Sequence, residues 1–586
     1  MSSTLRALFV LLVTTYHAVN AFTVFKSPFL YDWGFYGVFP RSSYKSFKGT
    51  APLLNFLRWD RDCDDGGYYL LSPRGSMVSK PGPVMFDPRG NLVWTDDSFG
   101  VVTDFKVQSY KGKSYLTFWS GTDGVKYRYG RGIYYMLDET YEVFRSIQSV
   151  GEGLMGDLHD LQITEEGTAL MTVYLNTPAD LSAIGGPADG WILDSIFQEV
   201  DIETGTLLFE WRASKHVGLR DSMLNFALGG KSAGRDPQTS FDFFHINSVD
   251  KDESGNYVIS ARHMHSVMCI SATDPSEILW TLGGTKNKFH DLSNGHATDF
   301  AWQHHARVHA NHTITIFDNA RSESIEYVGE YSRGLLLQLD TAAWTVKRLA
   351  EYADPSHRYR AQSQGSAQLM DDGKMLLSYG FLPNLVEFAS DGRVLCDVRL
   401  APLVISSFGM VTSYRAFKTS SWVGKPKTIP SIYLRASDRR MFVSWLGATE
   451  VDRWILQGAD WEGVQQDRYV DLLEKDKDGF EVSITLHDQM PEYIRVAAVD
   501  EKGNVLKHSE VVSRKKGNAP ATWIGSPYVT AGLCLAIIFV LLCFNRRKIL
   551  HKIGQVRRTK LSGANYWWGR RKDMAAAHEV QRLFED

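Results

Sequence analysis

Residues 84–94, VMFDPRGNLVW, place an aspartate-containing turn between two apolar strands, and five later stretches repeat this pattern. The later stretches are residues 135–144, 198–211, 269–280, 337–349 and 387–398. Their turn aspartates follow one another at intervals of 51–73 residues, and the chain between them lacks long helical periodicity. Six such units predict an all-β fold, a six-bladed β-propeller over residues 22–430. An array of β-sandwiches is the alternative.

A smaller β domain is expected after the propeller. Residues 431–512 consist of short alternating runs, with turn signals about every 10 residues. This pattern predicts a small immunoglobulin- or fibronectin-like β-sandwich that spaces or supports the propeller. Residues 513–522, which contain lysine, glycine and proline, are expected to form a stalk.

Both ends of the chain carry segments typical of secretion and membrane anchoring. Residues 1–21 combine a basic residue, an apolar run and small residues before a cleavage site, which predicts a signal peptide. Residues 523–544 contain no charge and are long enough for one transmembrane helix. The tail 545–586 is basic and therefore expected to be cytoplasmic. We expect a single-pass type I membrane protein with its propeller in the secretory lumen or outside the cell.

Composition and charge narrow the function classes. The chain has 586 residues, 44% of them hydrophobic and 22% charged, which is ordinary for a folded protein. The net charge is −3 although the tail is basic, so the remainder is acidic, which argues against nucleic-acid binding.

Three cysteines and one sequon lie in the predicted lumenal part. Cys63, Cys269 and Cys396 allow at most one disulfide there, and their pairing stays open. Asn311 begins the sequence Asn-His-Thr, an acceptor site for N-glycosylation in a secreted protein.

Three hairpins between the aspartate turns carry a histidine at nearly the same place. These histidines are His159, His245 and His304. Corresponding positions on successive blades surround one axis, so the three imidazoles are expected to converge near the mouth of the central channel.

A guanidinium is expected to join the imidazoles. Folding the chain back about the turn at 250–255 brings Arg262 beside His245 on the neighbouring strand. Arginine offers a planar fork of donors, so the group predicts a site for a tetrahedral anion such as phosphate or sulfate. The same folding places Asp318 or Asn319 near His304, where either could orient the ring.

The hairpins around these residues contain the motifs DFFHINSV at 242–249, NYVISARH at 256–263, LWTLGG at 279–284, WQHHAR at 302–307 and TIFDN at 315–319. These motifs resemble those of the arylsulfate sulfotransferase family, in particular its eukaryotic, fungal-type membrane-anchored branch. The similarity extends over about residues 66–512. It implies a six-bladed propeller.

The resemblance also implies a reaction. It implies sulfuryl transfer from a phenolic sulfate ester to a phenol acceptor, without a nucleotide sulfate donor, metal or other cofactor. His304 matches the nucleophile that becomes transiently sulfated, although the adjacent His305 leaves open which ring points inward. His245 and Arg262 match the residues that bind sulfuryl oxygens and assist the leaving phenolate, and His159 matches through its Leu-His-Asp context.

Two other functions fit the sequence. One is a non-catalytic membrane-anchored propeller that binds a glycan or a protein partner. The other is a metal-dependent hydrolase or lyase. In that hypothesis strand alternation puts His263 and His265 on one face, with His304 and His309 as further ligands.

Overall fold

The computed structural model describes residues 27–122, 129–227, 233–321, 329–435, 438–463, 465 and 468–516. The predicted signal peptide, the membrane span and the tail lie outside these residues. Among the residues described, no helix has the length and apolar character needed to cross a membrane.

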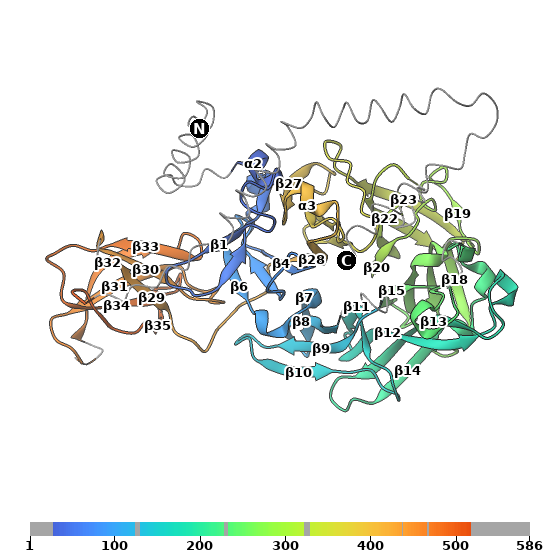
Figure 1. Ribbon diagram of the computed structural model, residues 1–586, viewed down its shortest axis with the longest axis horizontal. Helices are drawn as coiled ribbons and strands as arrows, with labels where there is room; N and C mark the ends of the chain where they lie inside the picture. The colour runs from blue at the N-terminus through green and yellow to red at the C-terminus, as the bar shows by residue number, and fades with distance from the viewer. Residues whose placement is uncertain are drawn as a thin grey trace, which may run out of the picture. The chain divides into compact units, whose positions relative to one another are not determined.

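Most of the described chain forms antiparallel sheets (Figure 1). Their hydrogen-bonded strands fall into six units of four, two of which share an eight-stranded sheet and two of which carry a fifth strand. Three units comprise β28 (Thr412–Thr419), β4 (Tyr68–Arg74), β5 (Val84–Phe86) and β6 (Leu92–Thr95); β7 (Val102–Tyr110), β8 (Lys113–Thr122), β9 (Arg131–Leu137) and β10 (Val143–Ile147); and β11 (Gly156–Ile163), β12 (Thr168–Ala179), β13 (Gly190–Asp201) and β14 (Leu207–Arg212). The others comprise β15 (Ile246–Lys251), β16 (Tyr257–Ala261), β17 (Ser266–Ile270) and β18 (Ile278–Gly283); β20 (His304–His309), β21 (Thr313–Asp318), β22 (Arg333–Asp340) and β23 (Thr345–Tyr352); and β24 (Ser366–Leu369), β25 (Met375–Ser378), β26 (Asn384–Phe388) and β27 (Val394–Arg399).

Short elements complete this part of the fold. They are β1 (Arg41–Ser43) paired with β2 (Thr50–Pro52), β3 (Asn55–Arg58) beside β27, β19 (His290–Asp291) beside β23, and the helices α2 (Pro28–Asp32) and α3 (Leu403–Ser406). The 3-10 turns are η1 (Arg61–Cys63), η2 (Asp97–Phe99), η3 (Ser182–Ile184), η4 (Ala213–Lys215), η5 (Leu219–Asp221), η7 (Pro237–Thr239) and η8 (Arg262–Met264). One pair, Gly156 with Gly132, joins β11 to β9 and so merges two units into an eight-stranded sheet.

The first strands of the units form a closed cycle of contacts. β28 contacts β7, and the cycle continues through β11, β15, β20 and β24 back to β28. In Figure 1 the labels of β7, β11, β15, β20 and β28 surround one centre. The chain closes the cycle by pairing the late strand β28 with the early strand β4. This arrangement is propeller-like.

The repeated aspartates lie in the connections between the third and fourth strands. Asp87, for example, accepts hydrogen bonds from the backbone N–H groups of Arg89 and Asn91. The carboxylates of the other five turn aspartates also accept backbone N–H groups two to four residues further along. Aspartate recurs because this side chain replaces the missing ladder partner at a tight turn.

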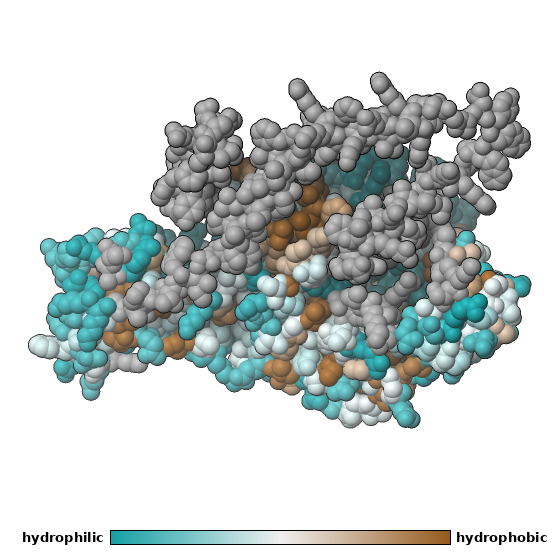
Figure 2. Space-filling model, in the orientation of Figure 1, coloured by the Kyte–Doolittle hydropathy of each residue, from teal (hydrophilic) through white to brown (hydrophobic). Residues whose placement is uncertain are grey.

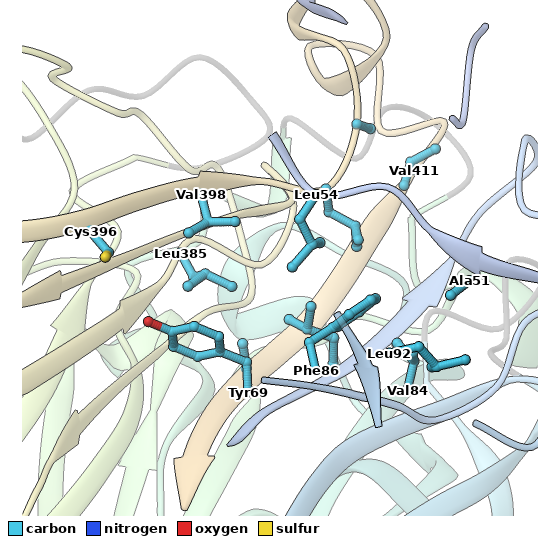
Figure 3. Close-up of a cluster of buried hydrophobic side chains, with 14 of the residues drawn as sticks. Ala51, Leu54, Tyr69, Val84, Phe86, Leu92, Leu385, Cys396, Val398 and Val411 are labelled. Carbon is cyan, nitrogen blue, oxygen red and sulfur yellow. The ribbon is translucent and has the colours of Figure 1, made fainter. Parts of the chain in front are cut away.

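A shared apolar core and a disulfide connect the two ends of the propeller-like part. Tyr69 and Phe86 of the first unit pack in one cluster with Leu385 and Val398 of the last unit (Figure 3). Cys63 and Cys396 form a disulfide across 333 residues. Cys269 is a buried free thiol.

Replacing Cys63 and Cys396 together with serine is expected to lower the free energy of unfolding by about 2–4 kcal/mol. The reason is that the crosslink restricts the unfolded chain over a very long loop. Chemical denaturation of the oxidised protein and of the double variant measures the difference, with Cys269→Ser as the control that leaves the crosslink intact. Equal midpoints for the double variant and the parent would contradict this expectation.

Residues 431–513 form two further antiparallel sheets. One contains β29 (Ser431–Arg435), β30 (Arg440–Ser444) and β33 (Glu481–Thr485); the other contains β32 (Val470–Asp476), β31 (Arg453–Ala459), β34 (Tyr493–Val499), β35 (Val505–His508) and β36 (Val512–Ser513). Both contribute to one apolar cluster, which includes Met441 and Trp454. The Glu481 carboxylate accepts the backbone N–H groups of Lys45 and Ser46 at 2.7 and 2.6 Å. This contact links the domain to the segment between β1 and β2.

Candidate active site

Three imidazoles converge where the first strands of neighbouring units begin. His159 lies in β11, His245 directly precedes β15, and His304 is the first residue of β20. The ring centroids of His159 and His245 are 5.0 Å apart, and those of His245 and His304 are 6.5 Å apart. The structure therefore brings together the three histidines singled out in the sequence.

Each of these imidazoles has a dedicated partner at Nδ1. His159 pairs with the Asp157 carboxylate, and His245 pairs with the Asp242 carboxylate at 2.5 Å. His304 pairs with the side-chain oxygen of Asn319 at 2.7 Å. Two rings therefore face a negative charge, whereas His304 faces a neutral amide. These partners differ in effect, because a carboxylate stabilises the protonated imidazolium and an amide oxygen does so much less.

His304 is held as a neutral imidazole whose Nε2 lone pair accepts one backbone hydrogen bond. Burial and the nearby charge of Arg262 hold the pKa of His304 well below its usual range. The amide nitrogen of Asn319 donates to the carbonyls of Ala361 and Gln364, both at 3.0 Å, so its oxygen faces the ring and Nδ1 carries the proton. The Gln364 backbone N–H donates to Nε2 at 3.2 Å.

Arg262 lies beside the imidazoles in a fixed orientation. Its backbone N–H donates to the carbonyl of His245 at 2.9 Å. One guanidinium nitrogen contacts Nε2 of His263 at 2.8 Å, and another donates to the Gln362 carbonyl at 3.0 Å. The guanidinium carbon lies 5.2 Å from the centroid of the Trp302 ring, a cation–π contact. The Arg262 guanidinium, which the sequence predicts beside His245, is thus held by contacts on three sides.

The strand alternation expected for His263 and His265 is wrong. Arg262–Met264 form the 3-10 turn η8, and His265 is left-handed, so the two rings do not share a strand face. Burial lowers the pKa of His263 well below its usual range. Its Nδ1 donates to the Asp242 carbonyl at 2.5 Å while Nε2 accepts from Arg262.

The metal-ligand set considered from the sequence is not assembled. Nε2 of His309 pairs with the Thr315 hydroxyl at 2.9 Å, as a hydrogen-bonded strand residue does. Asp242, His245 and His263 are close enough to share a cation, but both ring nitrogens of His263 are engaged. Binding of a cation through His263 would require one of these two bonds to break.

Three other predicted residues lie elsewhere. The Asp318 carboxylate accepts the backbone N–H groups of Ala301 and Ala320 and pairs with Arg333, so Asn319 alone of the two candidates contacts His304. His305 packs 5.5 Å from the Phe417 ring, and its Nδ1 lies 3.2 Å from the carbonyl of Ala367. Asn311 is exposed in the turn between β20 and β21.

A segment of the β23–β24 connection supplies backbone contacts to the site, through Gln362 and Gln364. Its other end is fixed by the His357 ring, whose Nδ1 lies 3.2 Å from Asp354 and 3.0 Å from Asp397. These three side chains could also share a cation. The segment is therefore anchored at one end and forms one wall of the site at the other.

Sequence reasoning missed Asp157, Asp242 and Gln364. The two aspartates precede their histidines by two and three residues, in DLH and DFFH, which is a signal available from the sequence. Gln364 contacts His304 across 60 residues, and no local pattern indicates this pairing.

A buried ionic network lies in the same strands as the imidazoles. Asp160, next to His159, pairs with Arg307 at 2.6 Å and with Arg415 at 2.7 Å. Arg415 also pairs with Asp104 at 2.7 Å, and Lys106 with Asp104 at 2.9 Å. Within this network three cations face two carboxylates, while Asp157 and Asp242 place two further carboxylates at the imidazoles.

Fold and site together define a propeller-like β protein with a buried cluster of imidazoles and a guanidinium. The chain belongs to the arylsulfotransferase (ASST) family, whose model matches residues 106–400, just over half of the sequence. The matched range contains His159, His245, Arg262 and His304. Family membership supports an arylsulfotransferase-like activity.

Comparisons with individual proteins add little. No curated protein matches the chain. A protein of unknown function from Bacteroides caccae is 13% identical with a TM-score of 0.34, covering 60% of this chain and 99% of that chain. The streptogramin B lyase structure is 9% identical with a TM-score of 0.29, at 67% and 94% coverage, and the Dos1 propeller 8% identical with 0.27, at 56% and 68%. These likenesses are too weak to carry an argument.

Proposed function

We propose that this protein transfers a sulfuryl group from a phenolic sulfate ester to a phenol acceptor through a sulfohistidine on His304. The observation that carries the proposal is the neutral His304 imidazole, protonated at Nδ1 and bordered by Arg262, beside two imidazoles that face carboxylates. Membership of the family supports the same reaction class.

In the first step Nε2 of His304 attacks sulfur and the bond from sulfur to the phenolic oxygen breaks. The hydrogen bond from Gln364 N–H to Nε2 has to break for this attack. His245 or His159 gives a proton to the departing phenolate, since each can carry a proton opposite its aspartate. Arg262 stabilises the charge on the sulfuryl oxygens.

In the second step the acceptor phenol attacks the sulfur of sulfohistidine. The N–S bond breaks, its electron pair returns to Nε2, and the phenolic proton goes to the imidazole that donated one in the first step. Two displacements at one nucleophile require ping-pong kinetics.

Full-length protein and a chromogenic aryl sulfate test the reaction, with and without a phenol acceptor. We expect acceptor-dependent release of the chromogenic phenol, sulfur label in the acceptor, and parallel lines in double-reciprocal plots. Release of free inorganic sulfate alone would indicate a hydrolase. No turnover with a panel of donors and acceptors would favour a propeller that only binds a glycan or a protein.

Changing Asn319 to aspartate is expected to move the acidic limb of the kcat/KM profile upward by about 1–3 pH units, because a carboxylate favours the imidazolium. The nucleophile must be neutral, and the pKa of His304 is held low by burial and by Arg262. Activity in the variant should therefore fall at acidic pH values where the parent is still active, and return as the pH rises. Asn294→Asp, at an exposed turn, adds the same charge as a control. An acidic limb at the parent's position would contradict the role of Asn319.

We also propose the finer organisation that the sequence indicates. In this proposal the six strand units are blades of one propeller, residues 431–512 form a sandwich, and the chain is a type I membrane protein of the fungal-type branch, anchored by residues 523–544. The closed cycle of first strands and the shared apolar cluster of the second domain support the architecture. The uncharged segment followed by a basic tail supports the anchor.

A further inference from the structure

Two short helices and the residues that follow them expose large apolar side chains. Six of these side chains are between 50% and 70% exposed: Phe29, Trp33, Phe35, Leu403, Val404 and Phe408. We call these six residues the apolar rim. Figure 2 shows brown, apolar surface in the part of the view where Figure 1 places α3. Exposed apolar groups gathered in this way mark an interaction surface rather than ordinary solvated surface.

The apolar rim lies at the same end of the first-strand cycle as the imidazoles; we call this cycle of six first strands the ring. α3 is the last element before the first strand β28, and five residues separate its end at Ser406 from that strand, while His245 directly precedes the first strand β15. First strands begin at the same end. α2 reaches this end through Asp32, which pairs with Arg399 at the end of the fourth strand β27. The Phe381 N–H also donates to the carbonyl of Ser363, within the segment that contacts His304.

The rim is almost free of charge. Residues 400–414 contain no charged side chain, and residues 27–40 contain only Asp32, which the Arg399 ion pair neutralises. Solvated surfaces carry frequent charges, and protein interfaces have polar rims. Exposed Trp and Phe side chains without charges are typical of side chains that sit at a membrane–water interface.

The chain itself supplies a bilayer within reach. Residues 523–544 are the proposed span, and fewer than ten residues separate them from Lys516, the last described residue. An extended chain covers at most about 3.3–3.6 Å per residue, so Lys516 is tethered within a few tens of ångströms of the bilayer.

We propose that the apolar rim inserts into the lumenal leaflet of the membrane in which the chain is anchored. The occupant of the rim is thus lipid, and the end of the first-strand cycle that carries the imidazoles is turned toward the bilayer. This inference rests on the proposed anchor but not on sulfuryl transfer, so its test does not depend on turnover.

The test uses full-length protein in phosphatidylcholine nanodiscs. Phe408→Cys is labelled with an environment-sensitive dye, in a background where Cys534 and Cys543 are serine; Cys269 is buried and the other two cysteines are paired. The control is Leu208→Cys, 53% exposed near the start of the fourth strand β14, which lies at the opposite end of the ring.

We expect shallow doxyl lipids to quench about half or more of the emission at position 408 and almost none at 208, since interfacial side chains lie roughly 5–10 Å deep. Equal, water-like emission at both positions overturns the proposal. Blue-shifted emission at 408 without lipid quenching also overturns it, because protein would then cover the rim. Failure to enter nanodiscs overturns the anchor and this inference together, while the transfer assay still reports on the proposed reaction.

Discussion

Replacing His304 with alanine is expected to lower kcat for acceptor-dependent sulfuryl transfer by at least about 10⁴-fold, the scale on which loss of a nucleophile acts in other covalent enzymes. His245 and His159 are not expected to take over, because the mechanism uses them as proton donors and their Nδ1 atoms are paired with carboxylates. His305 cannot take over either, since its ring packs against Phe417 and its Nδ1 faces the Ala367 carbonyl. The loss should appear in kcat and kcat/KM alike.

His309→Ala is the matched control for this variant. His309 lies at the other end of β20, and its ring bonds the Thr315 hydroxyl. The control should retain activity within a few-fold of the parent. Equal losses in both variants would point to damage of the strand, and full activity in His304→Ala would remove the sulfohistidine from the mechanism. Trapping label on the protein during turnover distinguishes the variants directly.

The sequence predicts the strand repeat because one local interaction recurs. Each turn aspartate caps its own backbone, so the signal lies within a few residues, as Asp87 and Asn91 show. The merged sheet at Gly156 and Gly132 was not predictable, since it depends on how two units meet. A single backbone pair between distant strands leaves no local pattern.

The site residues likewise divide into those that a local pattern predicts and those that it does not. His159, His245 and His304 follow from equivalent positions in a repeat, and Arg262 from the register of one hairpin. The pairing of His263 with His265 failed because it assumed a strand, whereas the chain leaves β16 in a 3-10 turn at Arg262. Strand alternation holds only where the ladder continues.

The second large effect concerns stability. Replacing Asp160 with asparagine is expected to lower the free energy of unfolding by about 3–5 kcal/mol, the cost of breaking a buried ion pair from one side. Asp160 is fully buried and pairs with Arg307 and Arg415. In the variant Asp104 would remain as the direct ion-pair partner of Arg415 and Lys106, and Arg307 would lose its ion pair, with all these side chains buried. An amide cannot replace the charge, and its NH₂ group adds donors where donors already converge.

The pH dependence separates this charge effect from a packing defect. Burial alone would raise the pKa of Asp160, but the charges of Arg307, Arg415 and Lys106 outweigh burial and hold it well below its usual range. A carboxylate with a depressed pKa contributes stability above its unfolded pKa of about 3.9, and loses it as the pH falls toward the folded value. Denaturation midpoints of parent and variant should therefore differ by a constant amount from about pH 5 to 8 and converge in stronger acid.

Asp391→Asn, the same change at an exposed turn, should differ little from the parent, because asparagine keeps the turn bond to the backbone N–H of residue 393. If the difference between the midpoints of the parent and Asp160→Asn persists unchanged into strong acid, the loss of stability is due to packing. The network would then stabilise the fold by filling space and not by its charges.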